Sequence, residues 1–178
     1  YRLGASCSCT PAFCSSSSVP ESTLKQYLGS VDEQGQYFRW TVEQTQEELT
    51  DVLNMHMDLK AEVILDLLPL KRGGSGRIIK LRLEYRDRAG RRQQGLLTSE
   101  FDIRKSLHRK FLYSSAMYIE KLQSRSAIPT GFIFHGAGWG HGVGLCQIGA
   151  LGMALRDFST EQILSHYYPG STLQKIYE

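Results

Sequence analysis

Residues 136–144 read GAGWGHGVG, so that glycine occupies every second position. In an extended chain alternate residues face opposite sides, so one face of this segment would be bare backbone and the other would carry Trp139 and His141. Each ordered glycine costs conformational entropy, so five in alternation point to a site where a ligand approaches the backbone closely. The alternative is that Trp139 belongs to the core and His141 bonds buried backbone.

The side chains in and after this stretch suit the recognition of a sugar. The indole face of Trp139 is a platform for a sugar ring, and its N–H can donate to a hydroxyl. His141 can exchange a proton near neutral pH or hydrogen-bond a hydroxyl. Gln147 begins a predicted helix, where free backbone N–H groups also lie. The predicted ligand-contacting set is Trp139, His141, Gln147, Gly138, Gly140, Gly142 and, as a second aromatic at the rim, Tyr168.

Several other functions are disfavoured by motif or by charge. The glycines fit neither the G-x-G-x-x-G pattern nor the phosphate-binding G-x4-G-K-[ST] pattern, which argues against nucleotide binding. The net charge of +3, from 21 basic and 18 acidic residues, is too small to argue for nucleic acid. Arginines cluster around residues 86–92, a pattern most typical of a solvated face. No apolar run is long enough to cross a bilayer.

Outward from the glycine stretch, short strand patterns are interrupted by helix patterns. Capping signals at Thr45, Ser99 and Ser159 mark the starts of three helices, and DRAG at residues 87–90 predicts a hairpin turn. The predicted strands are residues 37–43, 62–68, 77–85, 93–98, 112–122 and 131–135, and the predicted helices are a turn at 24–28, one from 45, and 99–109, 143–156 and 159–167.

These patterns predict an α+β fold with a mostly antiparallel, barrel-like sheet and a few short helices, since hairpin joints outnumber helical crossovers. Residues 1–36 contain a serine run and no hydrophobic period, so we expect a cysteine-containing loop segment there. Residues 37–178 are then the main domain. Within it, Gly149 and Gly152 share one helix face, which favours close packing.

The four cysteines predict a tether between the two ends of the sequence. Cys7, Cys9 and Cys14 lie close together, and Cys146 is far along the chain. Such a set can form a four-thiolate zinc site, form two disulfides, or remain ordinary thiols. A bond between Cys7 and Cys9 would be strained, whereas both can face one ion, so we favour zinc and expect Cys146 beside the other three. A weaker interpretation makes Cys146 a hydrolase nucleophile with a histidine as base.

Two segments resemble a known family. Residues 134–150, FHGAGWGHGVGLCQIGA, are similar to the signature of the SpoIID/LytB family, and residues 163–173, ILSHYYPGSTL, follow at the family's usual distance. The likeness extends less sharply upstream through residues 103–107, 75–77, 47–49 and 38–42, and so covers roughly residues 37 to 178.

The resemblance implies action on the glycan strands of peptidoglycan in the bacterial cell envelope, outside the cytoplasm. Degrading members are sporulation proteins that resemble lytic transglycosylases, in which a carboxylate cleaves the glycosidic bond and a sugar hydroxyl attacks to leave an anhydro end. By this resemblance Trp139, His141 and Gln147 line the glycan cleft. Other members are amidase enhancers, so the alternative is a non-enzymatic wall-binding module whose partner is a cell-wall amidase.

The sequence departs from that family in two places. The family's catalytic glutamate lies upstream in a G-V-V-x-x-E-M-P-like segment, and no such segment occurs here. Cys146 replaces the family's usual serine, and residues 7–14 stand where members carry a His/Cys/Gly-rich segment that binds metal in some of them. We therefore expect the C-terminal part of the family's domain, which supplies the cleft and is inactive by itself.

Overall fold

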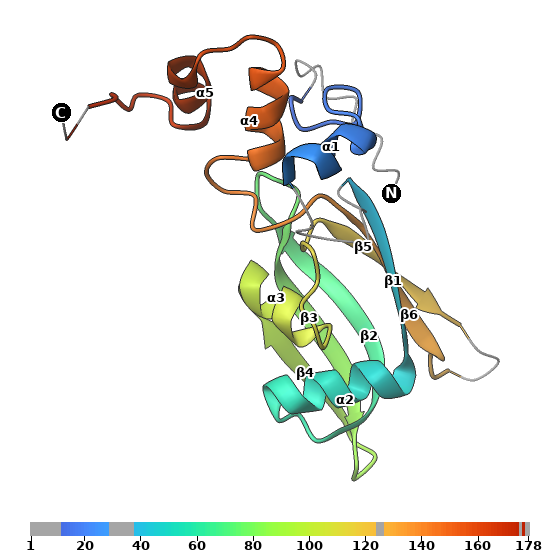
Figure 1. The fold of residues 1–178 in the computed structure, drawn as a ribbon. Coiled ribbons are helices and arrows are strands. Elements are labelled where there is room, and N and C mark those ends of the chain that lie inside the picture. Colours follow the sequence, from blue (N-terminus) through green and yellow to red (C-terminus); the bar gives the residue numbers. More distant parts are fainter. Residues whose placement is uncertain (1–11, 29–37, 124–126, 175, 177–178) are drawn as a thin grey trace. The chain divides into compact units, whose positions relative to one another are not determined.

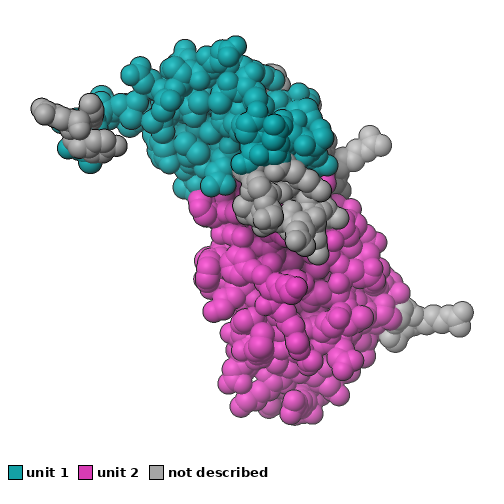
Figure 2. All heavy atoms as spheres, viewed as in Figure 1, with its two compact units in different colours: residues 1–35, 143–178 teal, residues 36–142 magenta. Residues whose placement is uncertain are grey.

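The structure, a computed structural model, describes residues 12–28, 38–123, 127–174 and 176. Contacts along the chain divide it into two compact units, which Figure 2 distinguishes by colour. Unit 1 takes its described residues from 1–35 and 143–178, and unit 2 takes them from 36–142. The glycine stretch therefore begins in unit 2 and ends in unit 1.

Unit 2 contains two antiparallel sheets among its described residues (Figure 1). The first has the order β1-β6-β5, and the second has the order β2-β3-β4. The strands are β1 (Arg39–Thr45), β2 (Ala61–Arg72), β3 (Ile78–Asp87), β4 (Arg92–Leu97), β5 (Met117–Leu122) and β6 (Gly131–Ala137). The predicted α+β class with antiparallel pairing is confirmed. The described strands form no closed barrel, so the barrel-like arrangement stays a prediction.

Two helices pack on the second sheet and close the core of unit 2. They are α2 (Gln46–Met57), which contacts β2, and α3 (Glu100–Ser106), which contacts β3. Alternate strand residues and one face of each helix turn inward, as the two periodicities require. The fully buried residues of this core include Leu49, Leu53, Ile64, Leu81, Leu83, Ile103, Phe132 and Phe134. Each such side chain contributes about 1.5–3 kcal/mol when removed from water.

Polar bonds tie the two sheets of unit 2 together. Lys121 on β5 pairs with Asp66 on β2, with 2.8 Å between Nζ and Oδ2. Arg72, the last residue of β2, donates to the carbonyl of Met117 at 2.8 Å. Burial lowers the pKa of Arg72 from its ordinary value. The two sheets are therefore joined by contacts between β2 and β5.

Local signals account for the helix starts. Thr45 accepts from the backbone N–H of Glu48 while the Glu48 side chain accepts from the backbone of Thr45, which completes the predicted capping box. Ser159 and Gln162 form the same pair in unit 1. Replacing such a cap by alanine typically costs about 1 kcal/mol.

Unit 1 is built from three short helices among its described residues: α1 (Glu21–Leu28), α4 (Gln147–Ala154) and α5 (Thr160–Tyr167). The two glycines of α4 allow other parts of the unit to approach. A Cβ on Gly149 would overlap the Tyr167 hydroxyl, and one on Gly152 would overlap the carbonyl of Phe13. The prediction that these glycines serve close packing is confirmed.

Several predicted element boundaries are wrong. The strand expected from residue 112 begins at Met117, because the preceding buried loop bonds sideways to β3, with Ile78 N–H donating to the Ser115 carbonyl at 2.9 Å. The helix expected from residue 143 begins at Gln147, since Gly144 has a φ of 75° and Cys146 is the cap. The helix expected to reach residue 109 ends at Ser106.

Candidate functional site

The backbone of the glycine stretch is not extended beyond the end of β6. Gly138, Gly140, Gly142 and Gly144 have φ values of 64°, 71°, 71° and 75°. L-residues rarely adopt such angles, whereas glycine adopts them without steric cost. The expectation of an extended segment with one bare face is therefore wrong. Alternation arises here because the chain turns into the left-handed region at every second residue.

Three residues distant in sequence hold the first part of this loop. Trp40 Nε1 donates to the carbonyl of Gly138 at 3.0 Å. The N–H of Gly140 donates to the carbonyl of Tyr113 at 2.8 Å. Arg77 donates from Nε to the carbonyl of Gly140 at 2.9 Å and from Nη2 to that of Trp139 at 3.1 Å. The loop is thus fixed by the fold of unit 2.

Two of the glycines also make room for side chains of unit 2. A Cβ on Gly136 would overlap the indole of Trp40, and one on Gly142 would overlap the guanidinium of Arg77. By contrast, a Cβ on Gly138 or Gly140 would meet nothing within 4 Å. Packing therefore explains why Gly136 and Gly142 are glycines. Gly138 and Gly140, on either side of Trp139, instead border open space.

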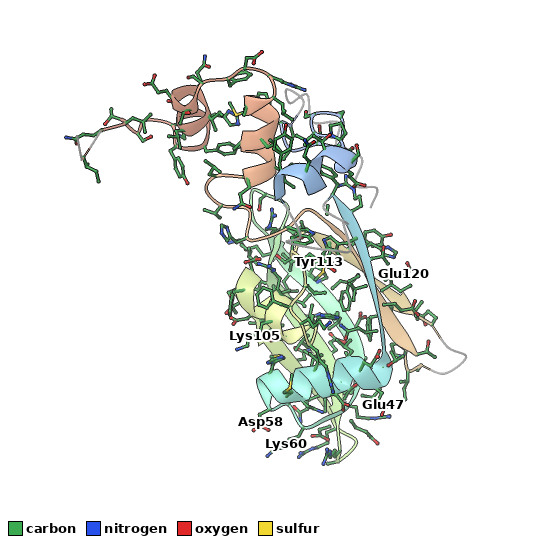
Figure 3. All side chains as sticks on the ribbon, viewed as in Figure 1. Glu47, Asp58, Lys60, Lys105, Tyr113 and Glu120 are labelled. Atoms are coloured by element: carbon green, nitrogen blue, oxygen red, sulfur yellow. The ribbon has the colours of Figure 1, made fainter. Side chains whose placement is uncertain are left out.

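An aromatic stack supports Trp139. Its ring lies 4.9 Å from that of Tyr113 with an interplanar angle of 16°. Tyr113, labelled in Figure 3, also contacts Trp40 at 5.6 Å between ring centroids. Trp40 is 2% exposed and belongs to the core, whereas Trp139 is only partly buried. Ring contacts therefore connect the buried Trp40, which is tilted against Tyr113, to the partly buried Trp139, which stacks on Tyr113.

The predicted site residues are shared between the two units. Trp139 and His141 belong to unit 2; Trp139 is partly buried and packs against the core, whereas His141 is exposed. Gln147 and Tyr168 belong to unit 1. Gln147 is exposed as the first residue of α4. The Tyr168 hydroxyl accepts from the backbone N–H of Leu145 at 3.3 Å, and its side chain is 45% exposed.

Cys14 and Cys146 both lie near Tyr167 in unit 1. Burial, with smaller contributions from the nearby Cys146 and Cys14 thiols, raises the pKa of Tyr167 to about 12. Cys146 is also the cap of α4, where its Sγ accepts from the N–H of Gly149 at 3.4 Å. The fold therefore brings one early cysteine and the late cysteine to the same hydroxyl.

The predicted zinc site involves residues that the structure does not describe. Cys7 and Cys9 lie outside the described residues. Among those that are described, no group of three potential metal ligands occurs. A four-thiolate site needs all four cysteines, so zinc stays a prediction.

Sequence reasoning missed Tyr113 and Arg77 as parts of the site. Tyr113 falls within the predicted strand 112–122, and nothing in its sequence neighbours marks it as the support for Trp139. Arg77 lies within the SGR triplet at residues 75–77, which carries part of the family resemblance. That triplet was the available signal for its role.

Comparison with known proteins places the chain in a family. It belongs to the family described as Domain of unknown function (DUF8618), which matches residues 9–144. The match contains the described part of unit 2 and the whole glycine stretch.

A relative is an uncharacterized protein of Brachyspira hyodysenteriae (strain ATCC 49526 / WA1), which is 30% identical over 150 residues. The alignment covers 81% of this chain and 35% of that protein, so this chain spans about a third of the length of the relative. Among the described residues, no helix is both long enough and apolar enough to cross a membrane.

Proposed function

We propose that this chain is the glycan-binding part of a peptidoglycan-acting protein of the SpoIID/LytB type, located in the bacterial cell envelope. The observation that carries the proposal is the aromatic cluster of Trp40, Tyr113 and Trp139, in which Tyr113 stacks on a Trp139 that is only partly buried. A flat aromatic surface suits the apolar face of a sugar ring. His141, two residues further on and exposed, supplies hydrogen-bonding atoms for sugar hydroxyls.

The rigidity of the loop supports this assignment. Binding weakens when side chains must be ordered on association, so a platform held in place beforehand loses less affinity. Trp139 is held through its own carbonyl by Arg77 and through its ring by Tyr113. A glycan would therefore meet a surface that is already formed.

Strand cleavage in this proposal belongs to a longer protein. Glycosidic bond cleavage needs a positioned carboxylic acid, and the sequence has no Asp or Glu from Ile128 to Arg156. The resemblance puts that acid in an upstream segment absent from this sequence. The chain alone then binds glycan strands without cutting them, as a non-enzymatic wall-binding or amidase-enhancing module would also do.

A zinc-bound or disulfide-bonded set of Cys7, Cys9, Cys14 and Cys146 is a structural part of the same proposal. The shared proximity of Cys14 and Cys146 to Tyr167 supports it. Thiolates suit zinc, which would cross-link the N-terminal segment to α4. Its role would be to order unit 1, and no catalytic step depends on it.

The proposal is tested by incubating the chain with peptide-free glycan strands and following tryptophan fluorescence and the masses of the products. We expect a saturable fluorescence change and no anhydro-sugar products. Neutral cellulose oligomers serve as the control for unspecific stacking. Absence of any fluorescence change would contradict the binding proposal, and anhydro products would contradict the assignment of cleavage to a longer protein.

A further inference from the structure

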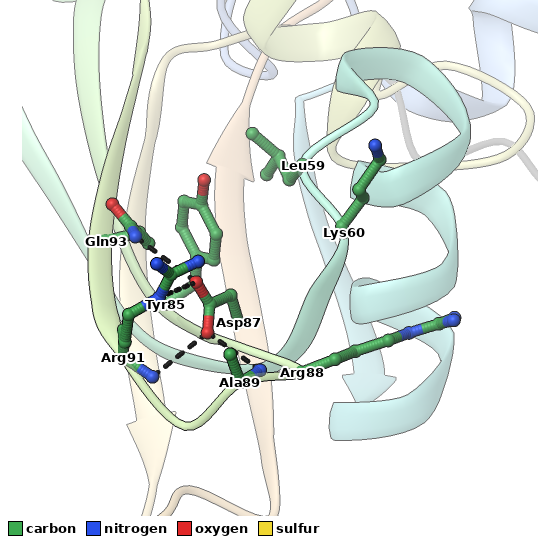
Figure 4. Close-up of a pocket in the computed structure, with 8 residues that line it drawn as sticks. All are labelled: Leu59, Lys60, Tyr85, Asp87, Arg88, Ala89, Arg91 and Gln93. Carbon is green, nitrogen blue, oxygen red and sulfur yellow. Dashed lines mark hydrogen bonds and ion pairs between the residues drawn. The ribbon is translucent and has the colours of Figure 1, made fainter.

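A pocket of about 370 Å³ lies in unit 2 between the loop after α2 and the tip of the β3–β4 hairpin (Figure 4). Leu59 and Lys60 line it from the loop, and Tyr85, Asp87 and Arg88 line it from the hairpin. Lys60 lies just beyond the C-terminal end of α2, where Figure 3 labels it. The volume is at the low end of the roughly 300–1,000 Å³ of small-molecule sites, so one compact molecule would fill it.

The carboxylate in this pocket is used by the hairpin itself. Asp87 Oδ1 accepts from the backbone N–H groups of Ala89 and Arg91 at 2.9 and 3.0 Å. Its Oδ2 accepts from Arg91 Nε and Gln93 Nε2 at 3.1 and 3.2 Å. A carboxylate has about four positions at which it can accept a hydrogen bond, so these four donors occupy all of them. Its charge is offset within the turn and does not repel an incoming anion at full strength.

Three cationic residues line the pocket that contains this carboxylate, and the side chains of Lys60 and Arg88 extend away from Asp87 (Figure 4). Lys60 and Arg88 are exposed, and neither has an ion pair or a side-chain hydrogen bond in the described part of the chain. Arg91 is 73% exposed and bonds Asp87 through Nε, and its Nη atoms have no hydrogen bond to other described residues. Asp58, the acid next to Leu59 in sequence, is not among the residues that line the pocket.

The rest of the lining is apolar. Leu59 is partly buried, and Tyr85 is 8% exposed, so the pocket floor is formed by groups that belong to the core of unit 2. An apolar floor favours an organic body over a bare ion, and guanidinium groups bind carboxylate or phosphate through two parallel hydrogen bonds.

We propose that this pocket binds a compact organic anion. Its carboxylate or phosphate is held by Lys60, Arg88 and Arg91, and its apolar body packs on Leu59 and Tyr85. The site is independent of the glycan-binding proposal, because none of its residues belongs to the aromatic stack.

The ligand class is tested with four probes on the full chain: benzoate, phenyl phosphate, benzyl alcohol and inorganic phosphate. We expect both aromatic anions to shift the backbone amide NMR signals of residues 59–60 and 88–93, and benzyl alcohol to leave them in place. If benzoate binds more tightly than phenyl phosphate, the anionic group of the ligand is a carboxylate; if phenyl phosphate binds more tightly, it is a phosphate. If neither aromatic anion shifts these signals, the proposal is wrong; if inorganic phosphate binds as tightly as phenyl phosphate, the apolar contact is wrong.

The charge contribution is tested with two double variants. Lys60→Gln with Arg88→Gln removes two pocket cations and is expected to weaken binding of the better aromatic anion by about tenfold or more. Lys80→Gln with Arg92→Gln removes the same charge from exposed strand positions outside the pocket and is expected to leave the affinity within about twofold. An equal loss in both double variants would mean that only the overall charge attracts the anion, which overturns the site.

Discussion

Arg77 Nε donates to the carbonyl of Gly140 at 2.9 Å, although the two residues are 63 positions apart. The same guanidinium bonds the carbonyl of Trp139 and occupies the space that a Cβ on Gly142 would need. One side chain immediately before β3 therefore fixes the loop that carries Trp139 and His141. The geometry of the proposed sugar platform depends on this contact.

Replacing Arg77 by lysine is expected to destabilise the protein by about 1–3 kcal/mol, because a lysine cannot reproduce two bonds from a planar fork. Urea unfolding followed by circular dichroism measures the change. Arg92→Lys, at an exposed position on β4, is the matched control and should stay within about 0.5 kcal/mol of the wild type. Equal stability of the two variants would show that Arg77 does not hold the loop.

Replacing Gly140 or Gly142 by alanine distinguishes the cost of a strained backbone angle from the cost of a steric clash with a neighbouring side chain. Gly140 and Gly142 share a φ of 71°, so either substitution should cost about 1–2 kcal/mol in backbone conformation. At Gly142 the new Cβ also collides with Arg77, whereas at Gly140 it meets nothing within 4 Å. Thermal unfolding should therefore show Gly142→Ala to be the less stable of the two. The reverse order would contradict the packing described for Arg77.

The elements that were predicted correctly are those with local causes. The capping box of Thr45 and Glu48 needs only residues within one helical turn, and it is present. The DRAG turn is likewise stabilised by Asp87, which accepts from Ala89 and Arg91 within the turn.

What could not be predicted depends on contacts between distant segments. The φ values of the glycine stretch follow from bonds to Trp40, Tyr113 and Arg77, none of which is near it in sequence. A repeat of period two is equally compatible with an extended strand and with a chain that turns at every second glycine, so periodicity alone could not separate them.

Asp87 predicts a pH dependence for the hairpin of unit 2. The backbone N–H of Arg91, followed by the side chain of Gln93, lowers its pKa below the ordinary value of 3.8. A lowered folded-state pKa stabilises the protein above the unfolded value, and this contribution is lost as the pH falls through the folded value. Unfolding midpoints measured between pH 6 and pH 2 should therefore fall less steeply for Asp87→Asn. If the unfolding midpoints of the wild type and of Asp87→Asn fell equally between pH 6 and pH 2, this role of Asp87 would be contradicted.

The cysteine tether predicts that at most a minority of the four thiols titrate in the native protein. Metal analysis combined with thiol titration before and after denaturation distinguishes the cases. Bound zinc with four thiols released by denaturant and chelator indicates a metal site, and thiols that appear only after reduction indicate disulfides. Four thiols that react at once in the native, metal-free protein would contradict the tether.

Trp139 is proposed to be a sugar platform, and calorimetry of the affinity for peptide-free peptidoglycan glycan strands tests this proposal. Trp139→Ala should lower the affinity about tenfold or more, since an aromatic contact with its buried area contributes on the order of 1–3 kcal/mol. Tyr27→Ala removes another exposed ring, from α1, and should leave the affinity unchanged. Wild-type affinity in Trp139→Ala, with both variants folded, would contradict the account.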